Sequence, residues 1–347
     1  MRFIVDKPRP AGFNMAADMY LLNRCADGGG VAVRFYSWAR PTVTVGYMQP
    51  AGDELDLEAL RADGAGWIRR ATGGRAVLHG GDATYCCAFH KGVEAMGNGI
   101  TQTYRIIASC LAEGLRRASI KCEAHGVSGG VEGVGREVKL PCFLAPNRDE
   151  IMVGGRKLIG SAQKRGAAAV MQHGSIPISG DYRKMPRYLN IGESEKRKQE
   201  ELLMQKSCCV EEIVSGVDFD RLVQCLIEGF SSTLPFKSEL MPWSQQEEEE
   251  IWGMAGSEEF KTYTSLPSPR KTRRFWATAS RRNRACRLQG PANLALPPTA
   301  PWQSGFAGIG GVRPPPRFRS AGRCARSLSW GKARSCSAAR ERGRCPR

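Results

Sequence analysis

The order of apolar and polar residues along the chain predicts a domain that contains both helices and strands. In residues 101–117 the side chains of Tyr104, Ile107 and Leu111 recur at helical spacing, so they share one face of a helix. Similar patterns predict further helices over residues 13–25, 55–62 and 218–234, and the beginning of an acidic helix over residues 247–251. Runs rich in β-branched and aromatic residues predict strands over residues 31–36, 42–46, 67–70, 75–79, 83–89 and 168–172.

The clearest hairpin joins residues 149–153 to residues 156–161. Gly154-Gly155 separates these two runs, and glycine readily adopts the positive φ angles that a two-residue hairpin turn requires. The predicted strands fall in groups, with helices between the groups. This order predicts an α/β (α+β) domain with a mixed, largely antiparallel sheet flanked by helices.

The formal charge of +17 is confined to one end of the chain. Residues 265–347 hold 19 of the 51 Lys and Arg residues but one of the 34 acidic residues, so residues 1–264 carry a net charge of −1. A basic surface is the usual mark of a nucleic-acid binder. The charge distribution therefore argues against nucleic-acid binding by residues 1–264, and leaves binding through the basic end as a separate hypothesis.

Residues 265–347 also differ from the rest in composition and in the pattern of apolar residues. They contain half of the 20 prolines and show neither helical nor strand periodicity. Such a composition cannot bury enough apolar surface to offset the entropy of ordering the chain. We expect one folded domain in residues 1–264 and a basic tail in residues 265–347. The tail is either a disordered extension or the product of a GC-rich gene translated in a shifted reading frame.

The thirteen cysteines are expected to be reduced thiols in a cytoplasmic protein. The first residues lack the apolar run of a signal peptide, and no segment approaches the roughly 20 apolar residues of a membrane span. No Cys-x-x-Cys pair occurs, and the four histidines show no metal-ligand spacing. We therefore expect no membrane segment and no metal site.

The densest chemical signal is the run from Arg69 to His79. Gly73-Gly74 lies between two short strands, where a backbone without side chains can approach a ligand and offer N–H donors. The neighbouring arginines Arg70 and Arg75 could bind a carboxylate or a phosphate. The alternative is a plain hairpin with solvated arginines, and the local chemistry does not separate the two.

Cys142 is the candidate nucleophile and Lys157 its candidate partner. A nearby ammonium lowers the pKa of a thiol and increases the fraction of thiolate that acyl transfer requires. The alternative is a cysteine that only fills the core. Cys86 and Cys87 are weaker candidates, because at least one side chain of an adjacent pair in an apolar strand faces the core. A Ser–His–acid triad lacks its Gly-x-Ser-x-Gly turn.

Three ordered motifs resemble the superfamily of biotin/lipoate protein ligases and octanoyltransferases. They are RRATGGRAVLH at residues 69–79, GRKLIGSAQ at residues 155–163 and QHGSI at residues 172–176, with similar residues at 13–16 and 34–36. The resemblance covers roughly residues 2–235 and implies the biotin/lipoate ligase-like catalytic domain. It further implies an enzyme of lipoate attachment rather than a biotin ligase.

Two chemistries compete within that resemblance. Lipoate–protein ligases use ATP and Mg²⁺ to form a lipoyl-adenylate, whereas octanoyltransferases take octanoate from acyl carrier protein through a cysteine thioester. The Cys-Phe pair at Cys142, with Lys157 the family distance downstream, resembles the octanoyltransferases of the lipoate-ligase-like type. This implies a transferase that needs no cofactor, with Cys142 as nucleophile and Lys157 as its partner. A non-catalytic homologue is the third hypothesis.

The resemblance also implies substrate contacts and partners. The donor is octanoyl–acyl carrier protein, and the acceptor is the glycine cleavage H protein or a lipoyl domain of a 2-oxoacid dehydrogenase. The expected substrate-binding residues are Arg70, Gly73, Gly74, Arg75, Ala76, Val77, Leu78, His79, Gly160, Ser161, Ala162 and His173.

Overall fold

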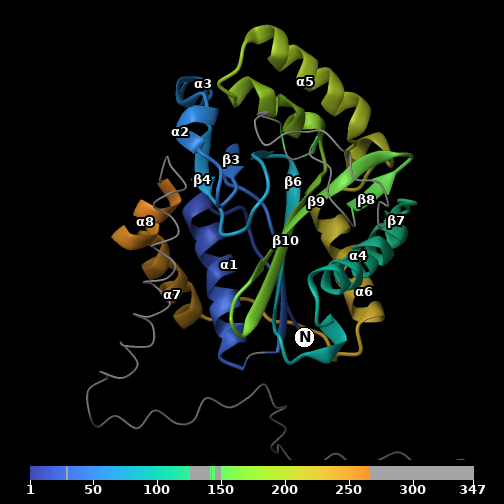
Figure 1. Ribbon diagram of the computed structural model, residues 1–347. Coiled ribbons are helices and arrows are strands. Elements are labelled where there is room, and N and C mark those ends of the chain that lie inside the picture. Colours follow the sequence, from blue (N-terminus) through green and yellow to red (C-terminus); the bar gives the residue numbers. More distant parts are fainter. Residues whose placement is uncertain (29, 126–140, 142, 145–149, 266–347) are drawn as a thin grey trace, which may run out of the picture. The chain divides into compact units, whose positions relative to one another are not determined.

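A computed structural model describes residues 1–28, 30–125, 141, 143–144 and 150–265 (Figure 1). The predicted nucleophile Cys142 and the basic tail from residue 266 onward lie outside the described residues. Within the described ranges, no helix is long and apolar enough to cross a membrane.

The main sheet confirms the predicted fold class. In the described part of the chain it has eight strands in the order β11-β1-β2-β6-β10-β9-β8-β7. Its neighbours pair antiparallel from β2 to β7, and parallel where β1 meets β2 and β11. The strands are β1 (Arg2–Val5), β2 (Val31–Tyr36), β6 (Asp82–His90), β7 (Glu123–His125), β8 (Glu150–Val153), β9 (Arg156–Arg165), β10 (Ala169–Pro177) and β11 (Glu239–Leu240).

The hairpin predicted around Gly154-Gly155 is confirmed. Strands β8 and β9 pair antiparallel on either side of it, and the two glycines have φ angles of 55° and 74°. Both angles lie in the left-handed region that favours glycine. The turn places Lys157, the second residue of β9, at the start of an inner strand of the sheet.

A second, smaller sheet has the order β4-β3-β5. Strand β3 (Thr42–Val45) lies in the centre, parallel to β4 (Gly66–Arg69) and antiparallel to β5 (Val77–His79). Strands β4 and β5 are therefore not partners, and the hairpin interpretation of residues 67–79 is wrong. Residues 69–79, called the glycine run below, lead from one outer strand to the other across the central one.

Two helices, α4 (Ile100–Arg117) and α6 (Phe219–Thr233), cover one face of the main sheet. The opposite face packs against α1 (Ala11–Ala26), and α7 (Gln245–Gly256) and α8 (Glu258–Ser265) contact α1 in turn. The remaining helical segments are α2 (Ala51–Glu54), α3 (Leu57–Ala62), α5 (Glu193–Lys206) and the 3₁₀ helices η1 (Glu94–Met96), η2 (Gly180–Tyr188) and η3 (Val210–Glu212).

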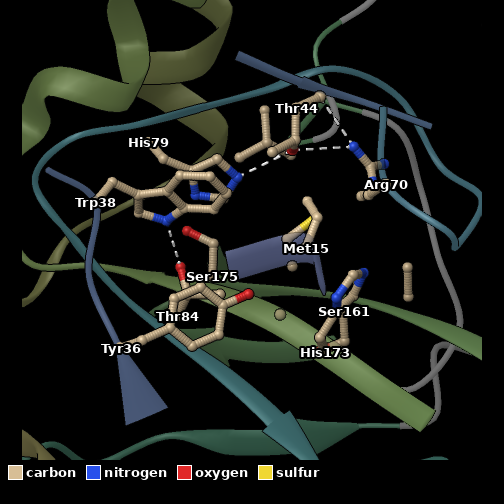
Figure 2. Close-up of a pocket in the computed structure, with 14 residues that line it drawn as sticks. Met15, Tyr36, Trp38, Thr44, Arg70, His79, Thr84, Ser161, His173 and Ser175 are labelled. Atoms are coloured by element: carbon tan, nitrogen blue, oxygen red, sulfur yellow. Dashed lines mark hydrogen bonds between the residues drawn. The ribbon is translucent and has the colours of Figure 1, made fainter. Parts of the chain in front are cut away.

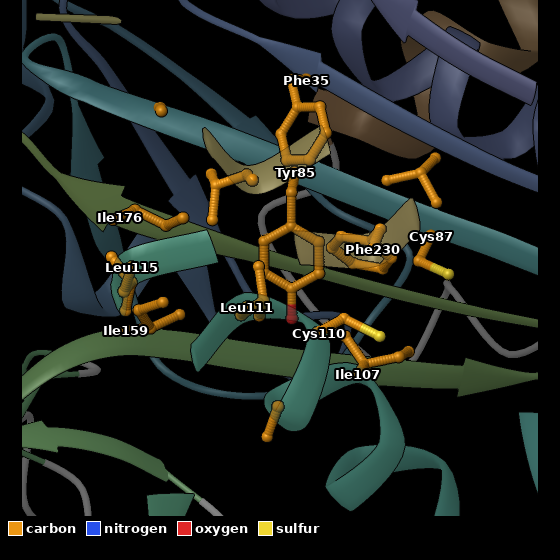
Figure 3. Close-up of a cluster of buried hydrophobic side chains, with 14 of the residues drawn as sticks. Phe35, Tyr85, Cys87, Ile107, Cys110, Leu111, Leu115, Ile159, Ile176 and Phe230 are labelled. Carbon is orange, nitrogen blue, oxygen red and sulfur yellow. The ribbon is translucent and has the colours of Figure 1, made fainter. Parts of the chain in front are cut away.

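Adjacent strand residues supply two separate cores, because side chains alternate between the faces of a sheet. Cys87 lies in the core under α4 and α6, whereas Cys86 lies in the core under α1. Figure 3 shows part of the first core, in which Tyr85 of β6 lies among Phe35 and Phe230. Burial raises the pKa of both cysteine thiols well above the ordinary value. Neither cysteine is therefore suited to be a nucleophile.

Helices α4 and α6 approach closely because glycines face each other where they cross. A Cβ atom added to Gly229 would lie 2.6 Å from the carbonyl oxygen of Cys110 and would also meet the backbone of Gly114. A Cβ added to Gly114 would lie 2.7 Å from Cα of Leu226. These neighbours are mostly backbone atoms, which cannot move aside as a flexible side chain can. The crossing therefore requires glycine.

Gly229→Ala should destabilise the protein by about 1–3 kcal/mol, because the added methyl group overpacks the crossing. The matched control is Gly253→Ala in α7, where no heavy atom lies within 4 Å of the new Cβ. That variant should be stabilised by up to about 1 kcal/mol, since alanine has the higher helix propensity. Urea unfolding measures both effects, and equal midpoints for the two variants would contradict the packing argument.

Candidate active site

A pocket lies between the main sheet, the small sheet and α1 (Figure 2). Carbon atoms form most of its surface, although many of its residues are polar. The pocket is lined by Met15, Tyr36, Trp38, Thr44, Arg70, Val77, His79, Thr84, Gly160, Ser161, Ala162, His173, Gly174 and Ser175.

His79 is held between a carboxylate and a hydroxyl group. Its Nδ1 lies 2.8 Å from Oδ2 of Asp82, and its Nε2 lies 3.0 Å from Oγ1 of Thr44. A carboxylate can only accept, so Nδ1 of His79 donates to Asp82. The ring of His79 stacks on Trp38 at a centroid distance of 4.3 Å, and the indole N–H donates to Thr84. The polar edges of both rings are thus occupied.

Asp82 anchors this chain of hydrogen bonds. Burial alone would raise the pKa of its carboxyl group. The attraction of His79 and hydrogen bonds from His79, Ser175 and Thr84 outweigh burial and hold that pKa below its ordinary value. The carboxylate is therefore ionised at neutral pH and fixes the orientation of the His79 ring.

His173 forms a second arrangement of the same kind. Its Nδ1 lies 2.9 Å from Oδ2 of Asp18, and its Nε2 lies 2.5 Å from Oγ1 of Thr72. The Tyr36 hydroxyl donates to the same carboxylate oxygen, and Arg34 donates to the other oxygen at 3.0 Å. His173 thereby ties β10 to helix α1 and to the start of the glycine run.

Arg69 and Arg70 are buried, so the interpretation of these arginines as solvated is wrong. Arg70 donates to the carbonyl oxygens of Gly73 and Arg75, each at 2.8 Å, and to that of Thr44 at 2.9 Å. Arg69 likewise donates to three carbonyl oxygens of residues 46–49. Both guanidinium groups bind backbone: Arg69 holds the loop that follows β3, and Arg70 holds the loop that follows β4. Binding of a substrate carboxylate by Arg70 stays a prediction.

Only part of the predicted glycine run reaches the pocket. Val77 and His79 of β5 line the pocket, whereas Ala76 and Leu78 lie in the core of the small sheet. This is the alternation expected of a strand. Arg70 also lines the pocket, whereas the other predicted residues of the run, Gly73, Gly74 and Arg75, do not.

Those three residues form the loop whose carbonyl oxygens Arg70 binds. Gly74 has a φ of 92°, and its carbonyl oxygen lies where a Cβ on Gly46 would be. Nη1 of Arg75 lies 3.8 Å from Oε1 of Glu54.

The predicted residues of β9 and β10 do meet at the pocket. Gly160, Ser161 and Ala162 lie opposite Ser175, Gly174 and His173 in the antiparallel register, and all six line the pocket.

Lys157 lies near the start of β9, shortly before Gly160, and is buried, with 4% of its surface exposed. Its Nζ is 5.7 Å from the centre of the Phe143 ring. A Cβ on Gly160 would lie 3.7 Å from Lys157 Cε and 3.8 Å from Phe143. Because Gly160 has no side chain, the space beside it connects Lys157 with the pocket.

Several pocket residues were not predicted from the sequence. Met15 and Tyr36 belong to segments that carried the family resemblance, but no role was assigned to them. Trp38 lies between two predicted strands and Thr44 lies within the second of them, residues 42–46, and neither is part of a distinctive motif. Asp18, which lies behind His173, had no signal beyond its place in a helix, because its contacts come from β2 and β10.

Among the described residues, no group of three or more His, Cys, Asp or Glu side chains is arranged to hold a metal ion. The eight cysteines of these residues are free thiols.

Comparison with known proteins gives a consistent family. Residues 10–231, more than half of the chain, match the lipoyl protein ligase A/B catalytic domain. The octanoyltransferase LipM of Kyrpidia tusciae is 35% identical over 230 residues, which cover 65% of this chain and 83% of that protein. The octanoyltransferase LipM of Geobacillus kaustophilus is 34% identical over 242 residues, covering 67% of this chain and 86% of that protein.

Solved structures show the same fold. A bi-partite lipoate protein ligase from Thermoplasma acidophilum matches with a TM-score of 0.62 and 21% identity, over 75% of this chain and 94% of that chain. A lipoate-protein ligase A bound with ATP matches with a TM-score of 0.61 and 22% identity, over 76% and 98%. With the pocket between its two sheets and its matches to both groups of proteins, this chain belongs to the lipoyl protein ligase A/B catalytic domain family and is of the octanoyltransferase LipM type.

Proposed function

We propose that this protein moves an octanoyl group from acyl carrier protein to a lysine of a lipoyl-accepting protein, through a thioester on Cys142. The observation that carries the proposal is the position of Lys157. This buried lysine lies beside Phe143, the residue bonded to Cys142, and at the end of the pocket that Gly160 opens. The relatives named octanoyltransferase LipM support the same activity.

The pocket suits a straight alkyl chain because its polar groups bind one another. His79 and His173 each use both ring nitrogens on protein partners. Their side chains therefore present mainly carbon to the pocket, together with Met15 and Val77. An alkyl chain gains about 0.8 kcal/mol for each CH₂ group buried in such a site. Gly160 and Ala162 leave the groove narrow but open.

The proposed reaction has two transfers. The thiolate of Cys142 attacks the acyl carbonyl, the carbon–sulfur bond to the carrier breaks, and the carrier leaves as a thiol after gaining a proton. The neutral amine of the acceptor lysine then attacks the new thioester, an amide forms, and Cys142 leaves as thiolate while the nitrogen loses a proton. The ammonium of Lys157 favours the thiolate in both steps.

The proposal requires no ATP or Mg²⁺, since a thioester is converted to a more stable amide. The acceptor class is a lipoyl domain or the glycine cleavage H protein. A lipoate protein ligase of the same fold, studied with its E2 lipoyl domain, supports that class. The ligase alternative would instead need ATP, Mg²⁺ and free lipoate. The position of Lys157 beside Phe143 gives no support to that alternative.

Incubation with octanoyl–acyl carrier protein should add the mass of one octanoyl group to the protein, at Cys142. Cys142→Ala should show no adduct and no transfer. The matched control is Cys122→Ala, which removes a partly buried thiol whose pKa is raised by burial, and it should be labelled as the native protein is. Intact mass and peptide mapping measure the adduct. Activity of Cys142→Ala with lipoate and ATP would instead establish the ligase.

A second prediction concerns the gap at Gly160. Gly160→Leu should slow octanoyl transfer by about a hundredfold, because the side chain enters the groove and displaces the acyl chain from its reactive position. Gly160→Ala should keep most activity, since its Cβ makes ordinary contacts of 3.7–3.9 Å.

A butanoyl donor is the internal control for the Gly160 variants. The ratio of butanoyl to octanoyl transfer should rise in Gly160→Leu and stay unchanged in Gly160→Ala. An unchanged ratio in both variants would show that the acyl chain does not pass Gly160.

A further inference from the structure

A layer of residues 180–212 lies behind Lys157 and has no part in the steps described so far. It consists of η2, α5 and the segment that follows α5 (Figure 1). Phe143 packs into a buried cluster with three of its side chains, Tyr182, Leu203 and Cys209. The residue next to Cys142 therefore packs on this layer as well as beside β9.

The backbone of Lys157 is attached to the same layer. The N–H of Cys208 donates to the carbonyl oxygen of Lys157 at 3.0 Å, and Lys157 forms a parallel bridge with Ser207. Arg183 of η2 donates to the carbonyl oxygen of Ser207 at 3.0 Å. The position of the lysine is thus set by the segment at Ser207 as well as by its own strand.

An ion network holds the preceding residue, Arg156, against the same segment. Arg156 donates to Glu212 at 2.6 Å, and Arg183 pairs with the other oxygen of this carboxylate. Burial alone would raise the pKa of Glu212, but hydrogen bonds from Arg183 and Arg156 keep it below the ordinary value. Glu212 therefore stays ionised at neutral pH and joins β9 to η2.

Tyr182 contacts both Phe143 and the segment at Ser207. Its ring lies 4.8 Å from the ring of Phe143, at an angle of 46°. Its hydroxyl donates to Oγ of Ser207 at 2.8 Å, and the Ser207 hydroxyl in turn donates to the carbonyl oxygen of Leu203 at 2.5 Å. Burial raises the pKa of Tyr182 to about 12, so the hydroxyl keeps its proton and its role as a donor.

We infer that Tyr182 is a positioning residue for acyl transfer, which sets Lys157 against Phe143 through its contacts with the Phe143 ring and Ser207. The inference rests on the proposed function, because it assumes that Lys157 acts on Cys142. Its physical basis is the steep dependence of rate on geometry, since a displacement of about 1 Å can cost about a hundredfold. Removal of one hydroxyl group should cause a smaller shift and cost about tenfold.

Tyr182→Phe should lower kcat about tenfold and leave KM for octanoyl–acyl carrier protein unchanged. The acid limb of the pH–rate profile should move to higher pH, because a misplaced ammonium stabilises the thiolate less. Ser207→Ala should have the same effects. The double variant should be no slower than either single variant, because one hydrogen bond carries the effect.

The matched control is Tyr188→Phe. Tyr188 lies on the same 3₁₀ helix and is as buried as Tyr182, at 5% exposed, but it packs in the core of the small sheet. This variant should keep the native kcat and pH profile. Thermal unfolding of all four variants measures the purely structural effect of each loss.

Two outcomes would overturn the inference. One is a native kcat and pH profile in Tyr182→Phe. The other is a loss of kcat that follows thermal stability equally in Tyr182→Phe and Tyr188→Phe. The proposed function is judged separately: it fails if Cys142→Ala still transfers octanoate, whereas the positioning role fails if Cys142→Ala is inactive and Tyr182→Phe is native.

Discussion

The structure depends on one buried cation, the guanidinium of Arg34. No part of its surface is exposed, and it donates to Asp6 at 2.7 Å and to Asp18 at 3.0 Å. Burial alone would lower the pKa of Arg34, but the charges of Asp18 and Asp6 hold it above the ordinary value. A buried charge without its partners costs several kcal/mol. Strand β1, helix α1 and strand β2 must therefore meet at this point, and His173 extends the constraint to β10 and the glycine run.

The same constraint explains how a pocket with many polar residues can hold an alkyl chain. Asp18 and Asp82 each orient a histidine, and each histidine occupies a threonine hydroxyl. Once these bonds are closed inside the protein, no polar atom of the set needs water, and carbon faces the cavity. The fixed dipoles also make the pocket rigid, because rotating one ring would break bonds at both of its edges.

Helices and turns that depend on neighbouring residues were predicted correctly from the sequence. Contacts between distant segments were not. The Gly154-Gly155 turn and the helices α1, α4 and α6 follow from spacing and glycine alone. Helix α5 escaped prediction because its surface is polar and only Gln199 and Leu203 are buried. From its charge and the neighbouring glycines, Arg70 was predicted to bind a carboxylate or a phosphate, and the family resemblance implied contact with the substrate. The sequence could not show that the loop's own carbonyl groups surround it, since that depends on the crossover from β4 to β5.

The packing of helices on the outer face of α1 limits where the chain's abrupt change of composition can begin without loss of core residues. Helices α7 and α8 cover this face, and the last buried side chains among the described residues are Phe260 and Thr264. The next residue, Ser265, is exposed. A change of reading frame upstream of Phe260 would remove part of the core, whereas one that begins after Thr264 leaves every described core residue in place.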